Sequence, residues 1–352
     1  MVRRNFWRFS LLLVLGVAIC GAAIKEVRAE EQLNLFIWSE YIDPEIVADF
    51  EKQFKCKVVI DLYEDNESLL AKIEGGGSSR YDVIVPSDYV ITTLVQKGLL
   101  AKLDKANIPN LANVEDTFIN PPYDPGNVYT APYQWGTVGI YLRKKPGAAI
   151  EESWSLLFDP AKQVGPFVMI DSMRENISAA LKYQGNSVNT VDPEKLKKAR
   201  DLLIEAKKRA LGFDGGVGGK NKVLARGAAL AVVYNGDAVR GMGEDPETAY
   251  FVPKEGGEIW MDNMAIPVKA PHKALAEKFI NFILDGKVGA QLSNFNQYAT
   301  PNKAAKPLIK PEDLANTAIY PTPEIMSKLE FLHDLGDKAK LYDEIWTQVK
   351  SK

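Results

Sequence analysis

The sequence predicts an α/β protein with two lobes, and three observations lead to this prediction. The chain has 352 residues, 46% of them hydrophobic and 25% charged, which is ordinary for a globular protein large enough for two domains. Apolar segments typical of strands alternate with amphipathic segments typical of helices, before residue 100 and again after residue 136. No low-complexity tract or long linker interrupts the chain. Such alternation builds mostly parallel sheets flanked by helices, and we expect two lobes joined by crossing strands around a cleft.

The first series of elements contains three strands and three helices. Residues 33–38, 57–63 and 82–85 are apolar segments of strand length. A helix is predicted to begin at Asp43-Pro44, because Asp is a good N-cap and Pro is favoured in the first turn. A second helix is predicted to begin with Asn66 as its cap and to end at the glycines 75–77, and a third covers residues 88–97.

The second series begins after the segment PYQWG at residues 132–136. Strands are predicted at residues 137–142, 167–171 and 229–234, with further strands up to Trp260. Helices are predicted near residues 154–158, from Ser172, and at residues 192–211. The last of these has an apolar stripe of Leu196, Ala199, Leu202, Leu203 and Ala206. The C-terminal portion reads as helical at residues 273–284, 287–296 and 338–350.

The first 29 residues have the pattern of a secretory signal peptide. Arg3, Arg4 and Arg8 precede an apolar run from Ser10 to Ile24, and Ala29 offers a cleavage site. The run is too short and too soon interrupted to be a stable membrane span. The Arg pair also suits twin-arginine export, and the segment ending at Cys20 resembles a lipoprotein cleavage box. We expect ordinary export, with these two routes as alternatives.

Charge and composition exclude several classes of ligand. Removal of residues 1–29 takes away five basic residues and one acidic residue, so the formal net charge of −3 becomes −7. An acidic protein is a poor partner for nucleic acid, which requires a basic face. Cys56 would be the only cysteine left, so no internal disulfide is expected. His272 and His333 are the only histidines, which excludes a His-rich metal site, and no cofactor is predicted.

Aromatic residues and carboxylates follow one predicted strand after another. Because ligands of open α/β sheets bind beyond the carboxyl ends of strands, these residues are candidates for a binding site. They are Trp38, Ser39, Glu40 and Tyr41 after the first strand, Ser87, Asp88 and Tyr89 after the third, Glu175 after residue 171, Tyr234 and Asp237 after the strand ending at residue 234, and Tyr298 in a later loop. Each has a structural alternative, such as core packing for the rings or helix capping for the acids.

The segment FVPKEGGEIWMDNMAIP at residues 251–267 is the most informative part of the chain. Residues two apart on a strand project from the same face, about 6–7 Å apart, so Trp260 and Asp262 should point together and Met261 away from them. An indole beside a carboxylate suits an alkyl chain that ends in an ammonium group, although a core Trp beside a turn-capping Asp would look the same. A pocket with several carboxylates is costly to desolvate unless a cation fills it, which favours a small, flexible polycation.

These residues carry a resemblance to a known family. The matching segments are FIWSEY at 36–41, YDVIVPSDY at 81–89, PYQWG at 132–136, YNGD at 234–237, VPKEGGEIWMDNMAIP at 252–267 and YATPN at 298–302. In order and spacing the chain resembles the spermidine/putrescine-binding proteins of bacterial ABC importers, over essentially its full mature length. The resemblance implies a two-lobed periplasmic-binding-protein fold (type II) with the ligand in the interlobe cleft, and capture of putrescine or spermidine by lobe closure.

The resemblance also assigns roles to individual residues. It places an aromatic box on the positions of Trp38, Tyr41, Ser87, Tyr89, Tyr234, Trp260 and Tyr298, and the ammonium-binding carboxylates on Glu175, Asp262 and, in the putrescine-selective branch, Asp237. With Ser39, these residues are the predicted ligand-binding site. Three positions depart from the family: Tyr234 replaces a frequent Trp, Ser172 replaces a second acid of the spermidine binders, and Leu332 replaces an amide. The loss of two spermidine-type polar contacts, at Ser172 and Leu332, together with the presence of Asp237, favours putrescine or mixed specificity.

The resemblance further implies domains and partners. Residues 30–135 with about 264–303 would form the N-terminal lobe, and 136–263 with about 304–352 the C-terminal lobe, with hinges near 133–137 and 264–267. A periplasmic monomer would deliver its polyamine to an ABC permease in the inner membrane.

Three other functions are weighed against this one. An exported enzyme lacks support, since neither G-x-S-x-G nor H-E-x-x-H is present, although Glu175 and Asp262 could imitate the acid pair of a carbohydrate-active enzyme. Residues 215–219 are glycine-rich but lack the spacing of a phosphate-binding loop, and we predict a flexible loop. A polyamine sensor or adaptor would share the site. An amino-acid binder would need an Arg in the pocket, and Arg174 is expected to face solvent because adjacent helical residues point about 100° apart.

Overall fold

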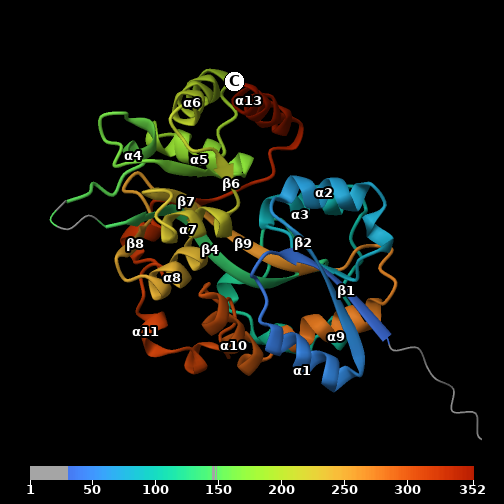
Figure 1. Cartoon of the computed structure of the whole chain (residues 1–352). Coiled ribbons are helices and arrows are strands. Elements are labelled where there is room, and N and C mark those ends of the chain that lie inside the picture. The colour runs from blue at the N-terminus through green and yellow to red at the C-terminus, as the bar shows by residue number, and fades with distance from the viewer. Residues whose placement is uncertain (1–30, 145–146, 148) are drawn as a thin grey trace, which may run out of the picture. The chain divides into compact units, whose positions relative to one another are not determined.

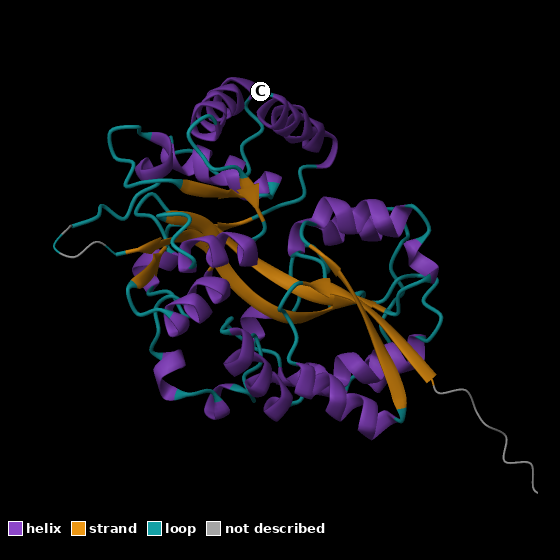
Figure 2. Ribbon diagram, viewed as in Figure 1, coloured by secondary structure: helices purple, strands orange, loops and turns teal. Residues whose placement is uncertain are grey.

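The structure is a computed structural model that describes residues 31–144, 147 and 149–352. The predicted signal peptide, its cleavage site and Cys20 lie outside the described residues. Residues Glu31–Lys352 form one compact unit in which helices and strands alternate along most of the chain (Figures 1 and 2).

The strands of the described residues form one connected network of mixed pairing. Most of them follow the spatial order β2-β1-β3-β9-β4-β7-β5-β6, with β10 beside β9 and β8 beside β4. Their bounds are β1 Glu31–Trp38, β2 Cys56–Tyr63, β3 Val83–Ile84, β4 Thr130–Arg143, β5 Phe167–Ile170, β6 Phe213–Asp214, β7 Leu230–Tyr234, β8 Thr248–Phe251, β9 Gly257–Ala265 and β10 Leu329–Phe331. β1 is parallel to β2 and β3, and β5 is parallel to β6 and β7. The predicted α/β class is therefore confirmed.

Strands β4 and β9 link these two parallel groups. They pair antiparallel from Thr130 opposite Ala265 to Thr137 opposite Ile259. β4 continues into pairing with β7 and β8, and β9 also pairs with β3 and β10. Every residue of β9 is buried, so its apolar residues have neighbours on both faces. Figure 2 shows the two long strands running side by side through the centre, which places residues of β9 between the groups.

Helices cover the strands, and several of them begin at a capping residue. Their bounds are α1 Pro44–Phe54, α2 Asn66–Glu74, α3 Asp88–Gln96, α4 Ser155–Phe158, α5 Met173–Tyr183, α6 Pro193–Lys207, α7 Gly216–Leu224, α8 Asn235–Glu244, α9 Lys273–Ile283, α10 Gly286–Asn296, α11 Pro311–Leu314, α12 Pro323–Met326 and α13 Ala339–Ser351. Asp43 caps α1 as predicted, because its Oδ1 accepts from the Glu45 N–H at 2.8 Å. Asp192 caps α6 and Asp285 caps α10 in the same way.

Three local predictions are wrong. The cap of α2 is Asp65, whose Oδ1 accepts from the Ser68 N–H at 2.7 Å, and Asn66 is the first helical residue instead. The glycine-rich residues 215–219 do not form a flexible loop: Gly216 begins α7, and Gly219 packs closely on β7, where an added Cβ would lie 3.2 Å from the Cβ of Ala231. The segment 132–136 does not precede a strand but lies within β4, where a β-bulge accommodates its proline.

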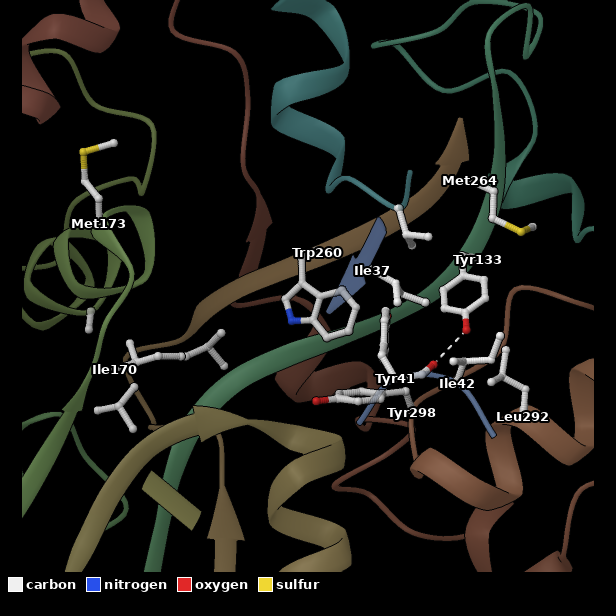
Figure 3. Packing of buried hydrophobic residues seen from close by; sticks show 14 of the residues in the cluster. Ile37, Tyr41, Ile42, Tyr133, Ile170, Met173, Trp260, Met264, Leu292 and Tyr298 are labelled. Carbon is white, nitrogen blue, oxygen red and sulfur yellow. Dashed lines mark hydrogen bonds between the residues drawn. The ribbon is translucent and has the colours of Figure 1, made fainter. Parts of the chain in front are cut away.

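The main apolar core continues into the centre of the molecule. Figure 3 shows Trp260, Tyr41 and Tyr298 close together beside β9, with the Tyr133 hydroxyl donating to the Tyr41 carbonyl at 2.8 Å. These rings belong to the same buried cluster as the apolar residues of β1, α1 and α9. The core therefore holds the aromatic side chains in place.

Candidate ligand-binding site

One pocket lies at the strand ends around the middle of β9. Its lining consists of Trp38, Ser39, Tyr41, Glu64, Ser87, Tyr89, Glu175, Gly216, Val217, Tyr234, Asp237, Glu258, Trp260, Asp262, Tyr298 and Leu332. The structure thus brings all eleven predicted site residues into one pocket, although they span residues 38 to 298. They come together because the carboxyl ends of β1 and β7, the segments after β1 and β3, and the first turns of α5 and α8 meet beside β9.

A chain of aromatic rings forms one wall of this pocket. Trp38 contacts Tyr234 edge-on at 6.2 Å between ring centroids, and Tyr234 contacts Trp260 at 5.9 Å with an angle of 87°. Trp260 then meets Tyr298 at 5.3 Å, and Tyr298 meets Tyr41 at 5.3 Å. Edge-to-face contacts favour ordered rings. The wall is therefore apolar, ordered and able to pack against a hydrocarbon chain.

The alternation predicted for β9 is present. Trp260 and Asp262 line the pocket, whereas Met261 packs on the other side with Trp135 and Val239. Glu258 lies two residues before Trp260 and also lines the pocket. The period of two that identified Trp260 and Asp262 would have identified Glu258 as well.

Asp262 is held by a buried chain of hydrogen bonds. The Ser87 hydroxyl donates to its Oδ1 at 2.6 Å, and the Asn66 amide donates to the Ser87 hydroxyl at 3.0 Å. Burial raises the pKa of Asp262 to about 7, with nearby Ser87 and Tyr41 acting to lower it and the charge of Glu175 acting to raise it. The carboxylate is therefore fixed in position but costly to ionise without a cation.

Glu175 lies in the first turn of α5. The Tyr234 hydroxyl donates to its Oε1 at 3.0 Å and the Ser172 hydroxyl donates to its Oε2. Its pKa is raised, because burial outweighs these hydrogen bonds. The position that carries an acid in the spermidine binders thus holds a hydroxyl that orients Glu175.

Asp237 lines the pocket but already has a cationic partner. The Arg240 guanidinium lies 2.6 Å from its Oδ1 and 2.9 Å from Oε2 of Glu40. Lys220 of α7 lies 3.4 Å from the same Glu40 oxygen. One oxygen of Asp237 is therefore occupied, which the sequence did not indicate.

Two carboxylates of the lining were missed by sequence reasoning. Glu64 accepts a hydrogen bond from the Ser39 hydroxyl. Glu258 is 2% exposed, and neither of its carboxylate oxygens has a hydrogen-bonding partner among the described residues. Leu332 also lines the pocket, so the position at which the family offers an amide is apolar here.

Arg174 was predicted to face solvent, and this prediction is wrong. The side chain is buried, and its guanidinium donates to the His333 carbonyl at 3.1 Å and to the Asn189 side chain at 3.0 Å. It also lies over the rings of Tyr89 and Tyr342, 5.1 and 5.0 Å from their centroids. Arg174 is outside the pocket lining, so no arginine clamp for an α-carboxylate is present among the described lining residues.

We expect Arg174→Ala to destabilise the protein. The change removes the guanidinium that donates to the His333 carbonyl and to Asn189 Oδ1, which then keeps only the His333 N–H as a donor. We expect this loss to lower the free energy of unfolding by about 2–4 kcal/mol. Denaturant unfolding of ligand-free protein measures this loss, with Arg226→Ala as the matched control because Arg226 is largely exposed. Equal stability of Arg174→Ala and the wild type would show that the buried guanidinium has no structural role.

The described residues hold no group of three or more His, Cys, Asp or Glu side chains that could bind a metal ion. Within the same residues, no helix is long and apolar enough to cross a membrane.

Fold and site together define a class of protein. The family described as bacterial extracellular solute-binding proteins matches residues 45–322, and the chain belongs to this family. The expected two-lobed fold of type II is confirmed by solved relatives, whereas the bounds of the lobes stay a prediction. Members of the family bind solutes, so the chain is a binding protein and the enzyme alternative is wrong.

The chain is similar to several named proteins over nearly its full length. The spermidine/putrescine-binding periplasmic protein of Escherichia coli K12 is 32% identical over 344 residues, 97% of each chain. The putrescine/cadaverine-binding protein of Pseudomonas aeruginosa PAO1 is 34% identical, over 96% of this chain and 98% of the relative. The solved structure of a spermidine/putrescine ABC transporter protein from Listeria monocytogenes has a TM-score of 0.85 and 32% identity, over 91% of this chain and 99% of that one.

Proposed function

We propose that this protein captures a polyamine in the pocket over β9 and delivers it to an ABC-type permease. The observation that carries the proposal is the pairing of buried carboxylates, Asp262 and Glu175, with an aromatic wall in one pocket. An ammonium group of the ligand would satisfy each carboxylate, and the rings would pack on the methylenes between them. The names of the relatives support the same class of ligand.

Contacts across the pocket support capture by lobe closure. Glu40, which follows β1, is bonded to Arg240 of α8 and lies near Lys220 of α7. Trp38 and Tyr234 meet across the same gap. These contacts join the proposed N-terminal and C-terminal lobes, and a ligand that touches both lobes would favour the closed form.

Short diamines fit the pocket better than spermidine. Ser172 is bonded to Glu175, and Leu332 offers no polar group, so two contacts that a longer polyamine uses in the family are missing. Asp237, the carboxylate of the putrescine-selective branch, is compensated by Arg240, so the proposed preference rests on Ser172 and Leu332 and not on Asp237. We therefore propose putrescine as the preferred ligand, with spermidine second. The periplasmic relatives support export of this chain, and we propose a monomeric carrier.

Calorimetric titration of ligand-stripped protein tests the proposal. Putrescine, spermidine and spermine are titrated in turn, with arginine and a disaccharide as controls. We expect tight one-to-one binding of putrescine, weaker binding of the longer polyamines, and no binding of the controls. Binding of a control without any polyamine would refute the cationic site, and a preference for spermidine would refute only the length selection.

A further inference from the structure

Glu258 is the one carboxylate of the described pocket lining whose oxygens both lack a hydrogen-bonding partner within 3.5 Å among the described residues. Desolvating an acid without a partner costs free energy, and such a group persists where something else compensates it. The side chain is 2% exposed and projects from the same face of β9 as Trp260 and Asp262. A buried carboxylate that lines the pocket and has no partner in the protein is expected to bind the ligand.

The neighbours of Glu258 indicate which part of the ligand it would contact. β10 pairs with β9 at Glu258, opposite Glu330, and Leu332 follows β10 in the same pocket lining. The charge of Glu175 raises the pKa of Glu258, so the two carboxyl groups are close enough to interact electrostatically. Tyr234, which donates to Glu175, is also affected by the charge of Glu258.

Resting on the proposed polyamine function, we infer that Glu258 is a further ligand contact and forms with Glu175 a two-carboxylate seat for one ammonium group. An ammonium group has three N–H donors, so it can satisfy both acids at once. The seat replaces the polar contacts that are missing at Ser172 and Leu332. The other ammonium group of a diamine is then left for Asp262.

Ligand binding at Glu258 and Glu175 is also coupled to the release of protons. Burial and the charges of Glu175 and Asp88 raise the pKa of Glu258, whereas Ser178 and Arg174 act to lower it. The charge of Glu258 also acts on Tyr234 and Tyr250, and the pKa values of both tyrosines are strongly raised. A bound ammonium group favours the ionised acids, so binding at pH 7 releases protons.

The variant Glu258→Gln tests this inference in ligand-stripped protein titrated with putrescine. We expect the affinity to fall at least fivefold. Fewer protons should be released on binding, which is measured by comparing titrations in two buffers of different ionisation enthalpy. The unfolding midpoint of the ligand-free variant should be unchanged or higher. The last result is expected because a buried acid without a partner is removed. Glu258→Met serves as a second variant should Glu258→Gln fold poorly.

Glu277→Gln is the matched control. Glu277 is equally buried, but Lys273 and Asn107 bond its carboxylate and it does not line the pocket. This control should lose stability and keep its affinity. An affinity of Glu258→Gln within fivefold of the wild type, with unchanged proton release, would overturn the inference. Failure of the wild type to bind putrescine would instead refute the proposed function.

Discussion

Replacing Asp262 by Asn will weaken polyamine binding at least tenfold and leave the fold intact. Removing one member of a buried charge pair costs about 2–5 kcal/mol in binding, because the ligand's ammonium group is left desolvated and poorly paired. Asn has the shape of Asp and its amide oxygen can still accept from the Ser87 hydroxyl. Calorimetric titration with putrescine measures the loss, and circular dichroism checks the fold.

Asp171→Asn is the control for Asp262→Asn. Asp171 also follows a strand, β5, but its carboxylate is half exposed and bonded to Lys350 outside the pocket. We expect its affinity to be that of the wild type. Unchanged affinity in Asp262→Asn would mean that the carboxylate on β9 does not contact the ligand, and the site would have to be abandoned.

Lowering the pH below 7 will weaken binding by up to tenfold per pH unit, while it stabilises the ligand-free protein. The pKa of Asp262 is raised to about 7, far above its unfolded value near 4. Between these values the folded state binds more protons than the unfolded state, so the free energy of unfolding falls as pH rises. A ligand cation needs the ionised form, so its affinity changes in the opposite direction.

Titrations with putrescine between pH 5 and 8, paired with thermal unfolding of the free protein, measure both trends. In Asp262→Asn both slopes should become smaller, and the slopes that remain reflect the other acids whose pKa values burial raises, which include Glu175, Glu258, Glu67 and Asp88. If affinity does not vary between pH 5 and 8, the carboxylates are ionised in the free protein, and ligand binding is not linked to their protonation.

Much of the site could be predicted from sequence because its geometry is local. Trp260 and Asp262 share a face because strand residues alternate, and this follows from covalent geometry alone. Tyr89 follows β3 and Tyr234 is the last residue of β7, and the ends of strands are where such folds bind ligands. Glu258 obeys the same alternation, and it was missed only because the motif was read as a triplet.

The wrong predictions concern residues whose environment comes from distant parts of the chain. Arg174 is buried because Tyr89 from α3 and Tyr342 from α13 pack against its guanidinium. Asn66 bonds to Ser87 rather than capping its helix, and Asp65 caps it instead. Helical spacing and capping preference hold no information about such neighbours.

The sequence by itself determined the α/β class, most of the elements and eleven of the residues that line the pocket, because hydrophobic period, capping and strand ends are local properties of the chain. Only the tertiary structure decided which carboxylates are free to meet a cation. Arg240 pairs with Asp237, Ser172 and Tyr234 bond Glu175, and Glu258 is left without a partner. Arg240 and Ser172 lie only three residues from Asp237 and Glu175, whereas Tyr234 lies 59 residues from Glu175. Distant segments of the chain bury all of these groups, and burial makes each missing or present partner energetically large.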